Sequence, residues 1–241
     1  MISIIVACNN KTILENVLIS SLDMQTFTDY ELIIVDSIRL GFNSAASALN
    51  YGASIAHGDL LLFIHQDVSF LSNDGLQQII DYSRKYDFGI AGVAGAIGEK
   101  KFEVASSVVM GAEHIQAGRL LTKPMRAFAL DECLLIVKAS NFLKFDNYGR
   151  TWHLYGPEYC YRILDNYQKV LLFPISIYHM SAANSLNYNY FDTLLLLAKK
   201  NKHMKLLRTC CGYFKNNFSL KLYCLYRKLK LYIKHIYERG K

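Results

Sequence analysis

The chain of 241 residues contains 52% hydrophobic and 20% charged residues, with 14 glycines and only three prolines. This composition predicts a folded protein with a sizeable core and excludes collagen-like, linker-dominated and globally disordered chains. The net charge of +7 hides an asymmetry. Residues 1–198 carry 14 basic and 19 acidic side chains, whereas residues 199–241 carry 13 basic side chains and a single acid. The sequence therefore predicts a mildly acidic body, residues 1–198, followed by a strongly basic tail, residues 199–241.

The cysteines and the N-terminal residues indicate a reducing compartment. The six cysteines form no C-x-x-C pair, and no basic residue precedes the first apolar run, which ends at Cys8. That run does not have the pattern of a secretory signal. The longest uninterrupted apolar runs, such as residues 60–64 and 194–198, are far too short to cross a bilayer. We expect a cytoplasmic protein with free thiols.

Along residues 1–94, short apolar runs alternate with segments of helical periodicity. The runs at 2–7, 30–35, 60–64 and 90–94 predict strands, and the segments at 10–24, 44–57 and 72–86 predict helices. Repeated strand–helix alternation with short connections predicts an α/β fold with a mostly parallel sheet.

After residue 94 the alternation weakens. Residues 95–126 predict loops and a lid, residues 133–137 and 170–173 predict strands, and residues 157–164 and 192–200 predict helices. In the tail, large apolar residues recur at alternating steps of four and three between lysines and arginines, which predicts a basic amphipathic helix. These apolar positions are Phe218, Leu222, Leu225, Leu229, Tyr232 and Ile236.

Polar residues follow the predicted strands, where ligands bind in open parallel sheets. Asn9 follows the first strand, Asp36 the second, and His65 and Asp67 the third. No Gly-x-Gly-x-x-Gly or Walker A motif follows the first strand, which excludes the usual dinucleotide and P-loop sites.

Five segments, in this order, resemble family 2 glycosyltransferases of the GT-A type. The first two, residues 3–10 and 31–36, are similar to the family's first two strands with their nucleotide loop and terminal Asp. Residues 50–67 resemble the helix and strand that lead to the metal motif. Residues 155–160 and 174–181 resemble the acceptor-base helix and the closing histidine segment. The resemblance covers about residues 1–185. Where the family has a D-x-D motif, this sequence has His65-Gln66-Asp67, which is similar to the HQD variant of a bacterial subgroup.

The resemblance implies an inverting, metal-dependent transfer of a sugar from a nucleotide-sugar donor to an acceptor hydroxyl. Asp67 matches the last Asp of D-x-D and would bind Mn²⁺ or Mg²⁺, with His179 as a metal or phosphate contact. His65 replaces the first Asp and is expected to contact the nucleotide. Alternatively, Asp67 caps a turn and His179 is an ordinary core histidine.

Glu158 is the residue expected to act as the base, because an inverting transfer needs a carboxylate to accept the acceptor's proton. The alternative is that Glu158 only stabilises the first turn of its helix. Asp131 and Glu132 are the rival carboxylates and are expected to contact acceptor or donor sugar.

Further contacts are expected around the nucleotide and the acceptor. Ala7 and Asn9 would shape the nucleobase loop, and Asp36 would hold the nucleotide, although Ser37 stands where relatives often have a second Asp. His153 and Tyr155 would flank the acceptor, or would merely pack in a loop.

The basic tail predicts a peripheral location at the inner face of the cell membrane, which would place the site near a lipid-linked acceptor. The resemblance implies that this acceptor is a growing surface glycan. The alternatives are a tail packed on the body or on a second copy of the chain. Departures from the family pattern at residues 37, 65 and 158 also leave a non-catalytic membrane scaffold as the second hypothesis. A nucleic-acid binder is the weakest reading, and no nucleic-acid partner is expected.

Overall fold

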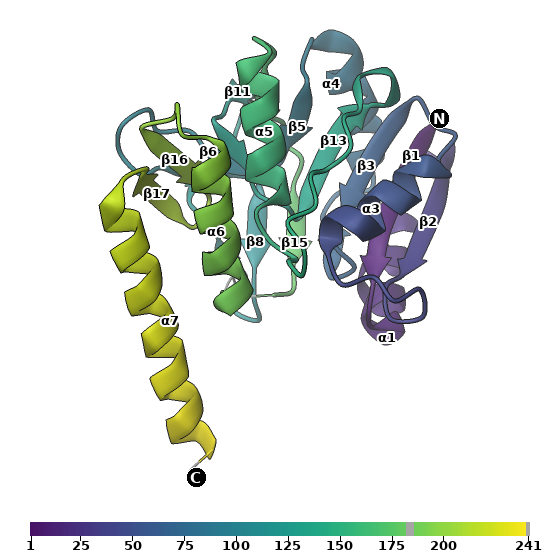
Figure 1. Ribbon diagram of the computed structural model, residues 1–241. Coiled ribbons are helices and arrows are strands. Elements are labelled where there is room, and N and C mark those ends of the chain that lie inside the picture. Colours follow the sequence, from purple (N-terminus) through teal and green to yellow (C-terminus); the bar gives the residue numbers. More distant parts are fainter. Residues whose placement is uncertain (182–185, 240–241) are drawn as a thin grey trace.

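The computed structural model describes residues 1–181 and 186–239, and its centre is a seven-stranded sheet (Figure 1). The strand order is β11-β14-β5-β13-β3-β1-β2. Strands β14, β5, β3, β1 and β2 run parallel, whereas β13 runs antiparallel to β3 and β5, and β11 is antiparallel to β14. The sheet is therefore mostly parallel, as predicted. Its strands are β1 (Ile2–Cys8), β2 (Tyr30–Asp36), β3 (Leu60–Ile64), β5 (Ile90–Gly92), β11 (Met125–Arg126), β13 (Leu134–Lys138) and β14 (Val170–Leu172).

Helices cover both faces of this sheet, which is why its central strands are almost wholly apolar. Alternate residues of β1 enter different cores: Ile4 packs with the first helical segment and α4, and Ile5 packs with α3 and α5. Figure 1 shows α3 and α5 in front of the sheet. The bounds are α1 (Lys11–Ile13), the π-helix η1 (Leu14–Ile19), α2 (Ser20–Leu22), α3 (Ala45–Ser54), α4 (Gly75–Lys85), the 3₁₀ turn η2 (Ala139–Asn141) and α5 (Tyr155–Asp165).

Two of these helices begin at side-chain caps, each of them one of two candidates that the sequence offers, Asn9 or Asn10 and Asn43 or Ser44. The Asn10 side chain accepts a hydrogen bond from the Ile13 N–H, and the Ser44 hydroxyl accepts one from the Ser47 N–H. Because both caps directly follow a strand end or its loop, they begin each helix close to the carboxyl edge of the sheet.

The prediction of loops across residues 95–126 is wrong, because this region contributes three strands to one small sheet and two strands to another. One has the order β10-β7-β6-β12, and the other β4-β15-β8-β9. The strands are only two or three residues long, which is too short for a period of two to be visible in the sequence. Their bounds are β4 (Val68–Phe70), β6 (Ala94–Ala96), β7 (Val104–Ser106), β8 (Val108–Met110), β9 (Ile115–Gln116), β10 (Arg119–Leu120), β12 (Ala129–Leu130) and β15 (Ile177–His179).

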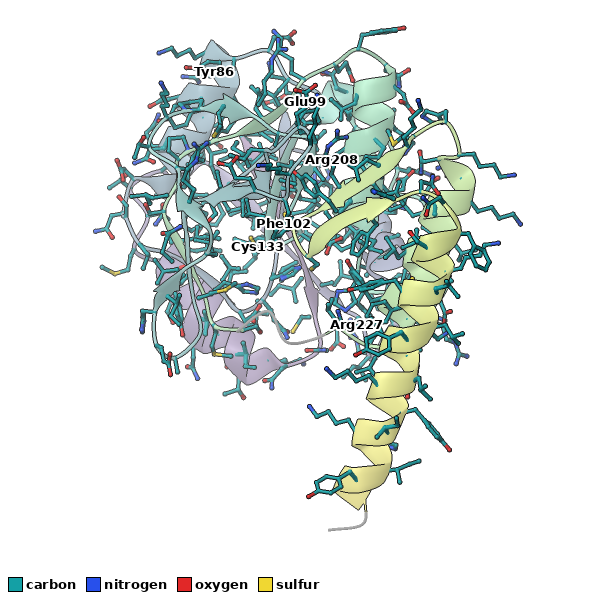
Figure 2. All side chains as sticks on the ribbon, turned by 90° about the vertical axis from the view of Figure 1, so that its left-hand side faces the viewer. Tyr86, Glu99, Phe102, Cys133, Arg208 and Arg227 are labelled. Atoms are coloured by element: carbon teal, nitrogen blue, oxygen red, sulfur yellow. The ribbon has the colours of Figure 1, made fainter. Side chains whose placement is uncertain are left out.

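The C-terminal region is more closely integrated with the body than the boundary at residue 198 implies. Helix α6 (Tyr188–Lys200) runs across that boundary, and an antiparallel hairpin of β16 (Leu206–Thr209) and β17 (Gly212–Lys215) follows it. Arg208 ties the hairpin to the body, because its guanidinium donates to the Glu99 carbonyl and its backbone pairs with the Tyr161 hydroxyl (Figure 2). Only α7 (Phe218–Arg239) forms the predicted amphipathic helix. Within the described residues, no helix is both long and apolar enough to span a membrane.

Candidate active site

A cavity of about 660 Å³ lies at the edge of the main sheet where β1, β2 and β3 end. The antiparallel β13 starts at this same edge, because Leu134 pairs with Ile64, and the His65 N–H donates to the Cys133 carbonyl at 3.0 Å. Because β13 runs antiparallel to its neighbours, the loop before it, residues 131–133, lies beside the ends of β1, β2 and β3. Nine residues predicted from the sequence line the cavity: Ala7, Asn9, His65, Asp67, Asp131, Glu132, His153, Tyr155 and His179.

His65, Asp67 and His179 form a compact cluster in this cavity. One ligand atom of each lies within 4.8 Å of the others. His65 Nδ1 is 3.5 Å from His179 Nε2, which is 3.3 Å from Asp67 Oδ1. The register of β15 against β4 creates this arrangement, because His179 pairs with Val68, the residue after Asp67.

The surroundings set the charges of this cluster. Burial and the neighbouring His179 lower the pKa of His65 to about 4, so its imidazole is neutral near pH 7. Burial opposes the ionisation of Asp67, but hydrogen bonds from His179 and Ser181 outweigh it and hold the pKa of Asp67 well below its usual range. Burial likewise disfavours charged His179, yet its contact with Asp67 outweighs this and raises the pKa of His179. Two imidazoles and a carboxylate fit a divalent transition metal ion such as Mn²⁺.

Gln66, between the two cluster residues, joins the first and third strands at their ends. Its side-chain oxygen accepts hydrogen bonds from the backbone N–H groups of Asn9 and Asn10, both at 3.0 Å. Its amide nitrogen donates to Asn9 Oδ1 at 2.6 Å. Gln66 thus fixes the loop expected to shape the nucleobase site. Its position inside the HQD motif was a signal that the sequence reasoning did not use.

Glu132 lies at the N-terminus of α5 and faces the cavity. Leu154, which precedes α5, has φ +68°, and this left-handed residue helps direct successive N–H groups toward the Glu132 carboxylate. The Gly156 N–H donates to Glu132 Oε1 at 3.2 Å. A Cβ on Gly156 would lie 2.9 Å from Glu132 Cγ, so the glycine leaves the space that the glutamate fills. Burial first and Asp131 second raise the pKa of Glu132 to about 8, against the effect of these N–H groups.

The structure does not place Glu158, the residue predicted to be the base, in the cavity. Glu158 is 1% exposed and does not line the cavity. Its two carboxylate oxygens accept hydrogen bonds from Arg162 at 2.9 Å and from Lys200 at 2.7 Å. The side chain lies on the face of α5 that meets α6, where it pairs with two cations, and Asp146 pairs with the second of them, Lys200. Position in the first turn of a helix could not reveal this, because Lys200 is distant in sequence.

Asp36 is at the end of β2 but does not line the cavity. Its neighbour Ser37 does line it. Asp36 accepts a hydrogen bond from the Arg39 N–H at 2.9 Å, and its carboxylate is 3.9 Å from the Lys11 ammonium group. The structure therefore places Ser37, rather than Asp36, at the cavity wall, and a nucleotide contact by Asp36 stays a prediction.

Several residues of the cavity wall were missed by the sequence reasoning. Trp152 and Phe102 line it with exposed fractions of 40% and 54%, and Cys133 lies in the same wall (Figure 2). The turn of the β16–β17 hairpin adds Cys210 and Cys211. The single tryptophan beside His153 was a usable signal. The hairpin residues carried none, because they reach the cavity only through tertiary packing.

Solved structures with similar folds include those of S. aureus TarS and GalNAc-T7. The structure of S. aureus TarS 1–349 matches with a TM-score of 0.55 and 13% identity, over 83% of this chain and 64% of that one. Its complex with UDP-GlcNAc matches with a TM-score of 0.54 and 12% identity, over 83% of this chain and 66% of that one. GalNAc-T7 with UDP, GalNAc and Mn²⁺ matches with 0.57 and 12% over 83% and 47%. The chain thus spans less than two thirds of the length of these structures.

Sequence comparison supports the same conclusion. No curated protein matches the chain. The profile of the Glycosyltransferase like family matches residues 3–171, which is more than half of the sequence. The fold is accordingly of the GT-A type, and the chain belongs to the Glycosyltransferase like family.

Proposed function

We propose that the protein transfers a sugar, with inversion, from a nucleotide-sugar donor to a glycan hydroxyl, with the help of a divalent metal ion. The observation that carries this proposal is the cavity in which the ends of β1 and β2 meet the His65–Asp67–His179 cluster. The similar structures that contain UDP-GlcNAc, or UDP with GalNAc and Mn²⁺, support a nucleotide-sugar donor.

The cluster residues would hold the metal ion, Mn²⁺ in preference to Mg²⁺ because two of the three ligands are nitrogens. His65 lies close enough to the other two to be a third ligand, in place of the nucleotide contact predicted from the sequence. When bound, the ion would neutralise the negative charge that the diphosphate gains as the glycosidic bond breaks. Gln66 would keep the Asn9 loop in place against the nucleoside.

Glu132 takes the role of base in this proposal. The acceptor oxygen attacks the anomeric carbon, its proton passes to the Glu132 carboxylate, and the electron pair of the breaking C–O bond leaves with the diphosphate. Support comes from its place in the cavity wall at the N-terminus of α5. Asp131, His153, Tyr155 and the exposed Trp152 would then surround the two sugars.

We further propose a lipid-linked surface glycan as acceptor, and a cytoplasmic location at the inner face of the membrane. The support is the charge of the tail, residues 199–241, which carries 13 basic residues and one acid. A homodimer formed through the tails is the less favoured proposal, because two strongly basic tails would repel each other.

A thermal-shift panel tests the donor site first. The probes are UDP, GDP, dTDP and CMP, each with and without Mn²⁺, on the wild type, on Asp67→Ala and on Asp87→Ala, an exposed aspartate outside the cavity. We expect one nucleotide to stabilise the wild type and Asp87→Ala in the presence of Mn²⁺, by about 2.7 kcal/mol at a hundredfold excess over Kd. Asp67→Ala should lose this shift.

The same panel can overturn the proposal. If no nucleotide stabilises the wild type with Mn²⁺, the non-catalytic scaffold becomes the better explanation of this fold. If Asp67→Ala keeps the full Mn²⁺-dependent shift, the cluster is not the metal site.

A further inference from the structure

Helix α7 has two unlike faces, and one of them is packed on the body. Leu220 is 3% exposed and Cys224 is fully buried. The Tyr223 ring contacts those of Phe191 and Phe214. On the same side, the Lys228 ammonium group donates to Asp192 Oδ1 at 2.6 Å. The N-terminal half of α7 is therefore anchored to α6 and to the β16–β17 hairpin.

The opposite face carries an exposed apolar stripe. Its six side chains are the apolar positions predicted in the tail, and each is 53–69% exposed. The neighbouring side chains of Tyr226, Ile233 and Tyr237 are 58–66% exposed. Figure 1 shows the C-terminal part of α7 extending past the body. An apolar surface of this extent marks an interaction site. The α7 stripe consists of Phe218, Leu222, Leu225, Leu229, Tyr232 and Ile236.

The charges around the α7 stripe select its partner. Lys221 borders it on one side, Lys230 lies beyond the tyrosines on the other, and no Asp or Glu occurs between Phe218 and Tyr237. The three-and-four spacing could also form a helix pair with a second copy, but the lysines flanking the seam would then face one another. Anionic headgroups above acyl chains complement both the charge and the apolar width.

We propose that the α7 stripe docks in the plane of an anionic lipid surface and thereby holds one wall of the cavity at that surface. The wall in question is the β16–β17 hairpin, which immediately precedes α7 in the chain and contributes Cys210 and Cys211 to the cavity. Arg208 fixes this hairpin to the body through the Glu99 carbonyl. The docked helix thus has a defined geometry relative to the cavity. This inference extends the proposed membrane location and does not depend on the proposed chemistry.

Vesicle sedimentation of the full chain tests the docking. The vesicles are phosphatidylcholine alone, or the same lipid with one third phosphatidylglycerol. Leu225→Glu with Leu229→Glu changes the stripe, and Ile55→Glu with Leu71→Glu is the matched control, because these body residues are also exposed, at 45% and 54%. Both double variants add the same charge. The nucleotide thermal shift with Mn²⁺ is recorded in parallel for each protein.

We expect binding only to the phosphatidylglycerol vesicles, weakening as the salt rises from about 0.1 M to about 1 M. The stripe variant should bind at least about tenfold more weakly, while the control variant stays close to the wild type. The inference is overturned if the wild type binds neither kind of vesicle, or if the stripe variant binds as tightly as the control variant. It is also overturned if the stripe instead holds a solution dimer, which light scattering would show as a mass halved in the stripe variant. A missing nucleotide shift in the wild type counts against the transferase proposal alone.

Discussion

Glu132 and Glu158 are two carboxylates at the same end of α5, the first partly buried and the second fully buried, and their partners differ. Backbone N–H groups of the first helical turn hold Glu132 on the cavity side. Arg162 and Lys200 hold Glu158 on the side of α6. A carboxylate neutralised by two cations stabilises the packing of helices, whereas one that faces a cavity can accept a proton. The comparison teaches that partners, more than burial or position in a motif, separate a structural acid from a catalytic one.

Glu132→Gln should have the largest effect. Transfer is expected to fall by about 10³-fold, because the amide cannot accept the proton of the acceptor. The amide oxygen can still accept the Gly156 N–H, so the free energy of unfolding should change by less than about 1 kcal/mol. Initial rates with the donor identified by the nucleotide panel, together with urea unfolding, measure both. A variant that keeps wild-type rates would remove Glu132 from catalysis.

Glu158→Gln should show the reverse pattern. Its loss leaves Arg162 and Lys200 without their shared carboxylate, which should lower the free energy of unfolding by about 2 kcal/mol. The transfer rate below the unfolding temperature should stay within about twofold, because the side chain is outside the cavity. The same two assays apply. A large fall in rate with little loss of stability would restore Glu158 as the base.

The pH dependence of transfer sharpens the comparison further. The pKa of Glu132 is raised to about 8, so its carboxylate form is scarce at pH 7 and increases as the pH rises through that value. Transfer should therefore rise about tenfold between pH 7 and pH 9. Asp131 helps to raise this pKa, so Asp131→Asn should move the rise to lower pH. A profile that is flat across this range in the wild type would contradict the assignment.

Gly156→Ala is the mildest test. The added Cβ would lie 2.9 Å from Glu132 Cγ, so the flexible glutamate must shift. A displacement of a few tenths of an ångström should reduce transfer by up to about tenfold. Stability should hardly change, since alanine favours the helix. Gly149→Ala is a control for the rate alone: its φ of +87° disfavours alanine, so stability should fall, but the residue is outside the cavity and the rate should stay unchanged.

Much of the body could be predicted because its signals are local. Strand β3 has the predicted bounds of 60–64, and Asn10 and Ser44 cap the helices that their positions indicated. Buried strands of a mostly parallel sheet are continuous apolar runs, and caps need specific side chains, so both are visible in a single sequence. The short strands within residues 95–126 were missed because two or three residues show no period.

By itself, the sequence determined the α/β class and the basic amphipathic helix, because both follow from local periodicity and charge. Strand ends and the family resemblance together indicated residues of the cavity, but not how they meet. The tertiary structure decided the rest. Reversal of β13 brings Glu132 to the site, Lys200 pairs with Glu158, and the hairpin adds Cys210 and Cys211 to the cavity. These contacts join residues far apart in the chain, and no spacing in one sequence records which distant side chains meet when the core packs.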